Sequence, residues 1–393
     1  MIKSRTSARI FALASIVLAA LSASAHAYDG LVKKEVFAMP SYTTVSGKTI
    51  KNLRVGYESY GTLNAAKDNV ILICHFFTGS SHAAGKYKVE DAAPGYWDAI
   101  IGSGKAIDTD KYFVISSDTL LNVNIKDPNV TTTGPSTIDP DTGKPYGMAF
   151  PVVSFRDFVN VQKSLLDSLG IRKLFAVAGP SGGGIQATEW SAAYPDMVER
   201  VIAVISPGLE IDGYGVGMLN LWSMPITLDP KWNNGDYYGR DEPLEGVAQA
   251  IKLLTLTLST NAGMGKRFGR NWAAPDKDPA VAMGDLYAIE DGLYKAGVAR
   301  AKTVDANQFL YLVKANQLFS VAADVKKIKA KFLFLPAKSD PLFPPWMARR
   351  SAETLKAQGN AVEVVELEGD GGHYDGIFSI NQATPAIKAF LAR

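Results

Sequence analysis

The stretch Leu174-Phe-Ala-Val-Ala-Gly-Pro-Ser-Gly-Gly183 decides the fold of this chain. Its apolar first half is typical of a buried strand, and a Gly-x-Ser-x-Gly pattern centred on Ser181 follows at once. Residues 185–193 then indicate a helix that stops before Pro195. A strand, a sharp glycine turn and a helix in this order predict a nucleophile elbow, which lifts a serine hydroxyl above a sheet. The alternative is an ordinary glycine-rich loop between a strand and a helix.

A serine nucleophile needs a base, and the chain contains only four histidines, His26, His75, His82 and His373. In the α/β-hydrolase fold that carries this elbow, the triad follows the order Ser, Asp or Glu, His. Only His373 comes after Ser181, so it is the predicted base. It lies in a glycine-rich loop behind a strand-like run, where active sites of open α/β sheets collect.

The acid of the triad is expected between the serine and the histidine, again at the end of a strand. Asp340 fits, because it follows the apolar run Phe332–Leu335 in a turn closed by Pro341. Its role would be to fix the imidazole tautomer and stabilise the imidazolium. Asp370 and Asp375 remain alternatives, although both belong to the loop of the histidine itself.

Two backbone amides are expected to form the oxyanion hole. One is that of Gly182, directly after the nucleophile, and the other belongs to a turn that follows an early strand. The apolar run Val70–Cys74 opens into such a turn, so the second donor is predicted to be Phe77. His75 and His82 precede the serine and are expected to be structural.

Strand-like runs that alternate with helical stretches predict an α/β fold with a mostly parallel, doubly wound sheet. Residues from Val36 to Glu58 alternate between apolar and polar and indicate antiparallel opening strands. The later strands are expected at Val70–Cys74, Tyr112–Ser116, Leu174–Ala178, Val201–Ile205, Phe332–Leu335 and Val362–Leu367, with a helix over Phe158–Leu169.

Between about Glu210 and Val321 the strand signal disappears. Apolar residues at helical spacing predict helices over Leu244–Leu258, Val281–Tyr294 and Asn307–Phe319. We therefore expect a hydrolase core over 28–210 and 321–393, with a helical cap inserted over 211–320. Aromatic residues in the cap are expected to line a pocket or, equally, to fill the cap core: Tyr214, Trp222, Trp232, Tyr237 and Tyr238.

Residues 1–27 have the pattern of a cleaved signal peptide. Lys3, Arg5 and Arg9 precede an apolar run that is short for a bilayer span, and Ala25-His-Ala27 has the form of a cleavage site. The sequence thus predicts a periplasmic or secreted protein without a stable membrane anchor, an uncleaved anchor being the alternative.

The composition narrows the choice of partners further. The chain has 41 basic and 39 acidic residues, and this near balance gives no reason to expect nucleic acid as a partner. A single cysteine, Cys74, forms no internal disulfide, and the few histidines are not at ligand spacing, so no metal or other cofactor is expected.

Several long segments resemble the homoserine O-acetyltransferase family of α/β-hydrolases. They are Tyr57–Asn64, Cys74–His82, Trp97–Asp98, Gly102–Ile115, Gly134–Pro135 and Gly143–Gly147. The resemblance extends from about Leu53 to the C-terminus and implies the same triad, Ser181, Asp340 and His373. It also points to a homodimer formed through the cap helices.

Two departures separate the chain from the acylating members of this family. Their elbow usually reads Gly-Gly-Ser-Met-Gly-Gly, whereas Pro180 and Gly182 flank the serine here. Their arginine that is thought to hold the homoserine carboxylate precedes a segment present here as Asp229–Tyr237, but Ser223 takes its place. A serine offers no charge for a bidentate grip on a carboxylate.

These departures, and an export signal that would separate the enzyme from cytosolic acetyl-CoA, predict a serine carboxylesterase. It would act on a small-molecule ester with a short acyl group, through an acyl-enzyme resolved by water. The alternatives are an O-acyltransferase of the homoserine O-acetyltransferase type and a non-catalytic binding protein built on the same fold.

Overall fold

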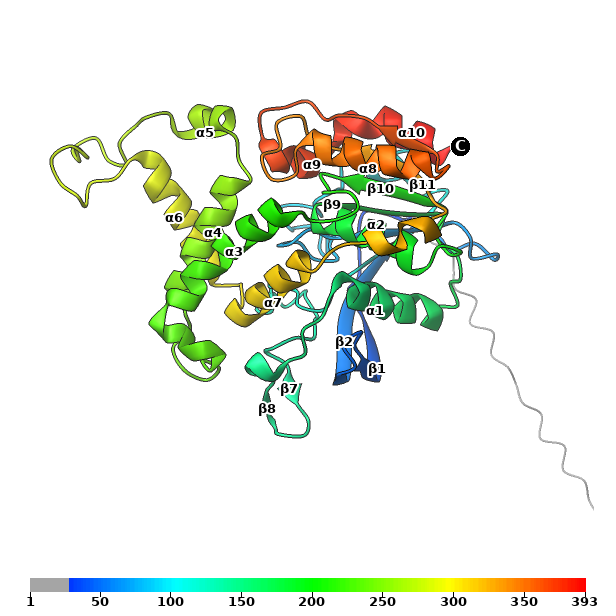
Figure 1. The fold of residues 1–393 in the computed structure, drawn as a ribbon, viewed down its shortest axis with the longest axis horizontal. Helices are drawn as coiled ribbons and strands as arrows, with labels where there is room; N and C mark the ends of the chain where they lie inside the picture. The colour runs from blue at the N-terminus through cyan, green and yellow to red at the C-terminus, as the bar shows by residue number, and fades with distance from the viewer. Residues whose placement is uncertain (1–27) are drawn as a thin grey trace, which may run out of the picture.

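The computed structural model describes residues 28–393, so the predicted signal peptide lies outside the described residues. An eight-stranded sheet in the order β1-β2-β6-β3-β9-β10-β11-β12 forms the centre of the molecule (Figure 1). The strands are β1 (Glu35–Thr43), β2 (Thr49–Tyr60), β3 (Val70–Cys74), β6 (Phe113–Ser117), β9 (Ala176–Pro180), β10 (Arg200–Val204), β11 (Lys331–Leu335) and β12 (Val362–Val364). Strands β1 and β2 are antiparallel to their neighbours, and the other six are parallel.

Each predicted strand is present, with ends shifted by a few residues. The largest difference is at β12, which ends at Val364 instead of Leu367. Leu367 still pairs with Ala337 through an isolated bridge. The opening pair β1 and β2 is antiparallel, as the alternating pattern predicted.

Strand β3 shows why the sheet must be covered on both sides. All five of its residues are buried, and they alternate between two apolar cores. Val70 and Leu72 contribute to one core, and Ile71 and Ile73 to the other. A strand buried on both faces reads as a continuous apolar run, which is the pattern of the sequence here.

Helices cover both faces of the sheet. Helices α1 (Phe155–Ser168), α2 (Gly182–Ala193) and α8 (Pro345–Ala357) contribute to the core that contains Val70. Helix α10 (Thr384–Leu391) and the segment 83–107 contribute to the other core. Short elements complete the fold: β4 (Ile101–Gly102), β5 (Ile107–Asp108), β7 (Ile138–Asp139), β8 (Lys144–Pro145), α9 (Asp375–Phe378) and five 3₁₀ turns at Gly147–Ala149, Pro230–Gly235, Ala322–Lys327, Gly372–Tyr374 and Ile380–Ala383.

The chain between β10 and β11 forms a helical block beside the sheet, the cap (Figure 1). It contains α3 (Gly213–Leu228), α4 (Leu244–Thr257), α5 (Asn261–Phe268), α6 (Ala288–Ala301) and α7 (Ala306–Gln317). The helix predicted over Val281–Tyr294 begins only at Ala288, so this prediction was wrong over its first half. Val281 is 81% exposed and Met283 fully exposed, so the apolar pattern there does not mark a buried helix face.

None of the helices within residues 28–393 is both long and apolar enough to cross a membrane.

Candidate active site

Ser181 lies at the sharp turn between β9 and α2. Its backbone has a φ of +56° and a ψ of −119°, a conformation that residues other than glycine rarely adopt. The turn is held by a hydrogen bond from the Ser181 amide to the Val204 carbonyl of β10, at 2.9 Å. The strained elbow predicted from the sequence is therefore present in the fold.

The glycines of the elbow allow three backbone segments to approach one another. A Cβ atom on Gly179 would lie 2.5 Å from the Cys74 carbonyl oxygen, and one on Gly183 would overlap the same oxygen. On the other side, a Cβ atom on Gly184 would lie 2.8 Å from the Ser206 Cβ. A side chain at any of these three positions would therefore clash, which explains the glycines there.

The structure brings Ser181, His373 and Asp340 together from three distant parts of the chain. The His373 Nε2 lies 2.8 Å from the Ser181 Oγ, and its Nδ1 lies 2.7 Å from Asp340 Oδ2. His373 is 2% exposed and Asp340 is 3% exposed. Little water therefore reaches these two hydrogen bonds to weaken them. The arrangement allows the imidazole to accept a proton from the serine hydroxyl while the carboxylate faces the opposite ring nitrogen.

Asp340 is itself oriented by the backbone. Its Oδ1 accepts hydrogen bonds from the amides of Leu342 and Phe343, at 2.9 and 3.0 Å. The other oxygen is left to face His373, which fixes the direction of the ring. The backbone of His373 is also fixed, because its amide donates a hydrogen bond to the Leu258 carbonyl at the end of α4, at 3.0 Å.

The two alternative acids face elsewhere. Asp370 pairs with Lys266 on the surface of the cap. Asp375 accepts a hydrogen bond from the amide of Gly371 in its own loop, at 3.0 Å. Burial raises the pKa of Asp375 above its usual value.

The two predicted oxyanion donors lie side by side. A Cβ atom on Gly182 would be 3.6 Å from the Phe77 nitrogen, so the two residues are neighbours, and Phe77 lines the same cavity as Ser181. Among the residues that the structure describes, neither amide donates a hydrogen bond to a protein acceptor. Both are thus free to bind an oxyanion.

His75 and His82 do not approach the serine. The Nδ1 of His75 bonds to the Phe76 carbonyl at 2.8 Å, and its Nε2 lies 3.2 Å from the Thr119 hydroxyl. Burial lowers the pKa of His75, which keeps the ring neutral. His82 lies against the buried carboxylate of Glu58, with 3.1 Å between Nδ1 and Oε2.

A small cavity of about 50 Å³ opens above Ser181 and His373. The remaining lining residues are apolar or uncharged: Phe76, Phe77, Thr78, Leu219, Trp222, Leu254, Leu258, Asn316, Leu342, Phe343, Tyr374 and Ile377. Among the cap aromatics, Trp222 lines this cavity, Tyr214 is 74% exposed, and Tyr237 and Tyr238 bond to Asp305 inside the cap.

Ser223 does not line this cavity. It contributes to a separate groove with Trp232 and Lys314. The serine at the position of the family's arginine therefore has no direct effect on the charge around Ser181. That charge depends on the residues that do line the cavity, and sequence reasoning did not identify most of them.

No group of three or more His, Cys, Asp and Glu side chains that could hold a metal ion occurs within the described part of the chain.

Comparison with known proteins agrees with this fold. The profile of the alpha/beta hydrolase fold family matches residues 69–379. The homoserine O-acetyltransferase of Deferribacter desulfuricans is 38% identical, over 93% of this chain and 96% of its own length. That of Methanosphaerula palustris is 40% identical, over 88% of this chain and 70% of its own length.

Two solved structures resemble the chain equally well in shape. The crystal structure of esterase E22 has a TM-score of 0.88 and 49% identity, and covers 92% of this chain and 100% of its own. The homoserine O-acetyltransferase of Bacillus anthracis has the same TM-score with 38% identity, and covers 92% of this chain and 98% of its own. The chain thus belongs to the homoserine O-acetyltransferase family within the alpha/beta hydrolase fold, and is an enzyme of that fold.

Proposed function

We propose that this protein is a serine carboxylesterase that hydrolyses esters of short acyl groups. The observation that carries the proposal is the uncharged lining of the cavity above Ser181. Homoserine carries a carboxylate and an ammonium group, and burying either one without a partner is costly. Apart from His373, none of the described residues that line the cavity is titratable near neutral pH and able to supply such a partner.

The proposed reaction begins when His373 accepts the Ser181 proton as the Oγ attacks the ester carbonyl. The carbonyl oxygen becomes an oxyanion, held by the Phe77 and Gly182 amides. The tetrahedral intermediate collapses, the bond to the alcohol breaks, and the imidazolium protonates the leaving alcohol. His373 then takes a proton from water, which attacks the acyl-enzyme. The imidazolium returns this proton to the Ser181 Oγ as the bond to the acyl group breaks and the carboxylic acid leaves.

The walls of the cavity support a short acyl group. The cavity is small, at about 50 Å³, and bulky apolar side chains border it, among them Phe77, Trp222 and Leu254. The 49% identity to a protein described as an esterase supports the same choice.

The alternative activity, acyl transfer to homoserine, is favoured by the names of the relatives that are 38–40% identical. Hydrolysis of p-nitrophenyl esters of increasing acyl length, with and without acetyl-CoA and homoserine, separates the two. We expect turnover of short esters that is indifferent to both additions and absent from Ser181→Ala. Formation of O-acetylhomoserine at a rate above hydrolysis would establish the transferase instead. A protein with neither activity that also resists a fluorophosphonate would be a non-catalytic binder.

We also propose that residues 1–27 direct export and are removed after Ala27. A periplasmic or secreted enzyme would lack cytosolic acetyl-CoA, which fits hydrolysis better than transfer. Mass spectrometry of the native protein should find an N-terminus at Tyr28. An intact Met1 on active protein in the cytosol would contradict export.

The proposed homodimer has a structural basis in α3. Tyr214, Leu221, Met224 and Leu228 are between 41% and 74% exposed and recur at helical spacing along one side of this helix. We propose that a second copy of the chain covers this row. Light scattering should give a dimer for the wild type and a monomer for the double variant Leu221→Glu, Leu228→Glu. A monomeric wild type would contradict the proposal.

A further inference from the structure

The oxyanion turn, residues 76–79, depends on side chains from elsewhere for its shape. It has no place in a helix or a strand. Within the turn itself, the Gly79 amide donates to the Phe76 carbonyl at 2.9 Å, and the His75 ring bonds to the same oxygen. Among the described residues, the carbonyls of Thr78 and Gly79 accept no hydrogen bond from the backbone and need other donors.

Two asparagines supply these donors. The Asn122 side-chain amide donates to the Gly79 carbonyl at 3.0 Å, and the Asn124 amide donates to the Thr78 carbonyl at 3.0 Å. The Asn122 oxygen in turn accepts hydrogen bonds from the backbone and side-chain nitrogens of Asn124, at 3.0 and 3.2 Å. Both side chains are buried, so these bonds are shielded from competing water.

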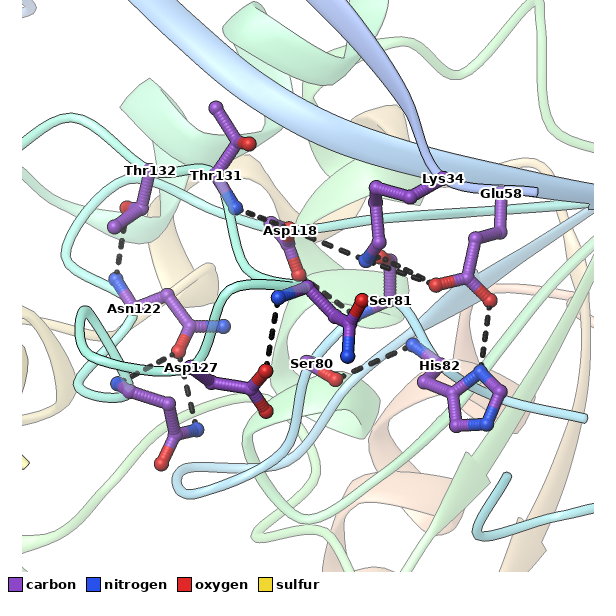
Figure 2. Close-up of polar contacts among 12 residues, drawn as sticks. Lys34, Glu58, Ser80, Ser81, His82, Asp118, Asn122, Asp127, Thr131 and Thr132 are labelled. Atoms are coloured by element: carbon purple, nitrogen blue, oxygen red, sulfur yellow. Dashed lines mark hydrogen bonds and ion pairs between the residues drawn. The ribbon is translucent and has the colours of Figure 1, made fainter. Parts of the chain in front are cut away.

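The loop that contains this turn continues to Ser81 and His82, and charged side chains hold it there (Figure 2). Asp118 accepts a hydrogen bond from the Ser81 amide at 2.8 Å. Lys34 lies between two fully buried carboxylates, 2.8 Å from Glu58 Oε1 and 3.5 Å from Asp118 Oδ2. In Figure 2 the His82 ring faces the other oxygen of Glu58. The loop is therefore held on both sides of the turn.

The loop 122–124 is also bound to the cap. Gln308 of α7 donates to the Asn122 carbonyl at 3.0 Å, and the Asp305 amide donates to the Val123 carbonyl at 2.9 Å. Arg300 of α6 donates to the Asn124 side-chain oxygen at 2.7 Å. A displacement of the cap would therefore reach the oxyanion turn through these two asparagines.

We propose that Asn122 and Asn124 are positioning residues of the oxyanion hole, an inference that rests on the proposed function. They fix the carbonyls of Gly79 and Thr78, and so aim the Phe77 amide at the carbonyl oxygen of the bound ester. Neither side chain touches the reacting atoms. Their contribution comes from holding a transition-state donor at the correct place before the reaction begins.

The test replaces the donating amide by an oxygen of the same shape, in Asn122→Asp and Asn124→Asp. Asn360→Asp is the matched control, because the Asn360 amide also donates to two backbone carbonyls, those of Ile328 and Ala330, away from the active site. Loss of a whole oxyanion donor costs about 10²–10³ in kcat. We expect a misplaced donor to lower kcat for p-nitrophenyl acetate at least about tenfold, with KM changed less than about twofold.

A second readout separates positioning from general damage. Ethylboronic acid adds to the serine Oγ to form a tetrahedral anion, one oxygen of which occupies the oxyanion hole. We expect its inhibition constant to rise by the same factor as kcat falls, while the Asn360→Asp values stay near those of the wild type. An unchanged kcat in folded variants would overturn the proposal. So would a fall in kcat without weaker binding of the boronic acid.

Arg300→Met provides a test that keeps both asparagines. The Arg300 side chain lies at the cap surface, so this variant is expected to fold even if the aspartate variants do not. We expect a smaller fall in kcat, about threefold, together with weaker binding of the boronic acid. If neither kcat nor the inhibition constant changed, the result would count against the proposal. A wild type that hydrolyses no ester would refute the proposed function instead. Boronic acid binding, followed by the fluorescence of Trp222 in the cavity wall, would still test the positioning.

Discussion

Ser181 owes its position to the glycines beside it. Its own positive φ is tolerated because the strand before it and the helix after it are both fixed in the core. Gly183 lies so close to the Cys74 carbonyl that the two backbones are in contact. The choice of residues beside Ser181 is therefore restricted by the space available and less by charge.

Gly183→Ala should therefore destabilise the protein by about 3 kcal/mol or more, because backbone atoms cannot move aside as a flexible side chain can. Gly265→Ala is the matched control. Its Cβ would meet nothing within 4 Å inside α5, so this change should stabilise by about 0.5–1 kcal/mol. Urea unfolding of the two variants measures both values. Equal stability of the two variants would contradict the close packing described for the elbow.

Asp340 acts only through His373, so Asp340→Asn should preserve the fold and remove most of the activity. An amide at this position favours the wrong imidazole tautomer, and kcat should fall by about 10⁴. Asp375→Asn provides the comparison, since Asp375 bonds within its own loop, and it should retain kcat within about tenfold. Steady-state hydrolysis of p-nitrophenyl acetate measures both. A larger loss in the Asp375 variant would mean that the acid has been assigned to the wrong residue.

At the scale of elements, the cap helices α3 and α4 form one wall of the cavity. Leu219 and Trp222 come from α3, and Leu254 from α4, with Leu258 just beyond its end. The loop of His373 hydrogen bonds to the end of α4, so the same helix shapes the pocket and supports the base. Acyl-chain specificity should therefore respond to changes in α4.

Leu254→Ala should enlarge the cavity and shift the preference toward longer acyl groups. One methylene in an apolar pocket is worth about tenfold or more, so the ratio of kcat/KM for butyrate over acetate should rise by about that factor. Leu256→Ala is the control, because Leu256 lies on the same helix but is 45% exposed and does not line the cavity. Rates on p-nitrophenyl esters give the ratio. An equal shift in both variants would place the acyl group elsewhere.

At the scale of the whole molecule, a buried ionic cluster ties the opening strands to the active-site loops. Glu58 of β2 is fully buried and contacts Lys34, His82 and Tyr87. Burial raises its pKa, but the hydrogen bond from His82 and the positive charge of Lys34 outweigh this and set the pKa at about 2. In the unfolded chain the pKa returns to 4.5.

The stability that ionised Glu58 contributes should thus be complete above about pH 4.5 and lost as the pH falls to about 2, since the folded state binds the proton less readily. A difference of this size corresponds to about 3 kcal/mol. Urea unfolding between pH 5 and pH 2 should show a flatter pH dependence for Glu58→Gln than for the wild type. Glu353→Gln, at an exposed site of α8, should keep the wild-type slope. If the free energy of unfolding changed with pH equally in all three proteins, Glu58 would not be the source of this pH-dependent stability.

The sequence by itself determined the strands, the elbow and the residues able to form the triad. Continuous apolar runs mark strands buried on both faces, and the glycines around Ser181 record a close approach of backbones. Because parallel strands end at one edge of the sheet, residues just after β9 and β11 were expected to lie near each other. Those signals are local and can be read one segment at a time.

Only the tertiary structure decided which aspartate meets His373, which residues line the cavity and what holds the oxyanion turn. Asp340 lies 33 positions from the histidine, whereas the nearer Asp375 folds back on its own loop. Asn122 and Asn124 carry no motif, and their role follows from the packing of the loop after β6 against the turn after β3. Such contacts depend on strand order and on the docking of the cap, and local sequence patterns do not encode either.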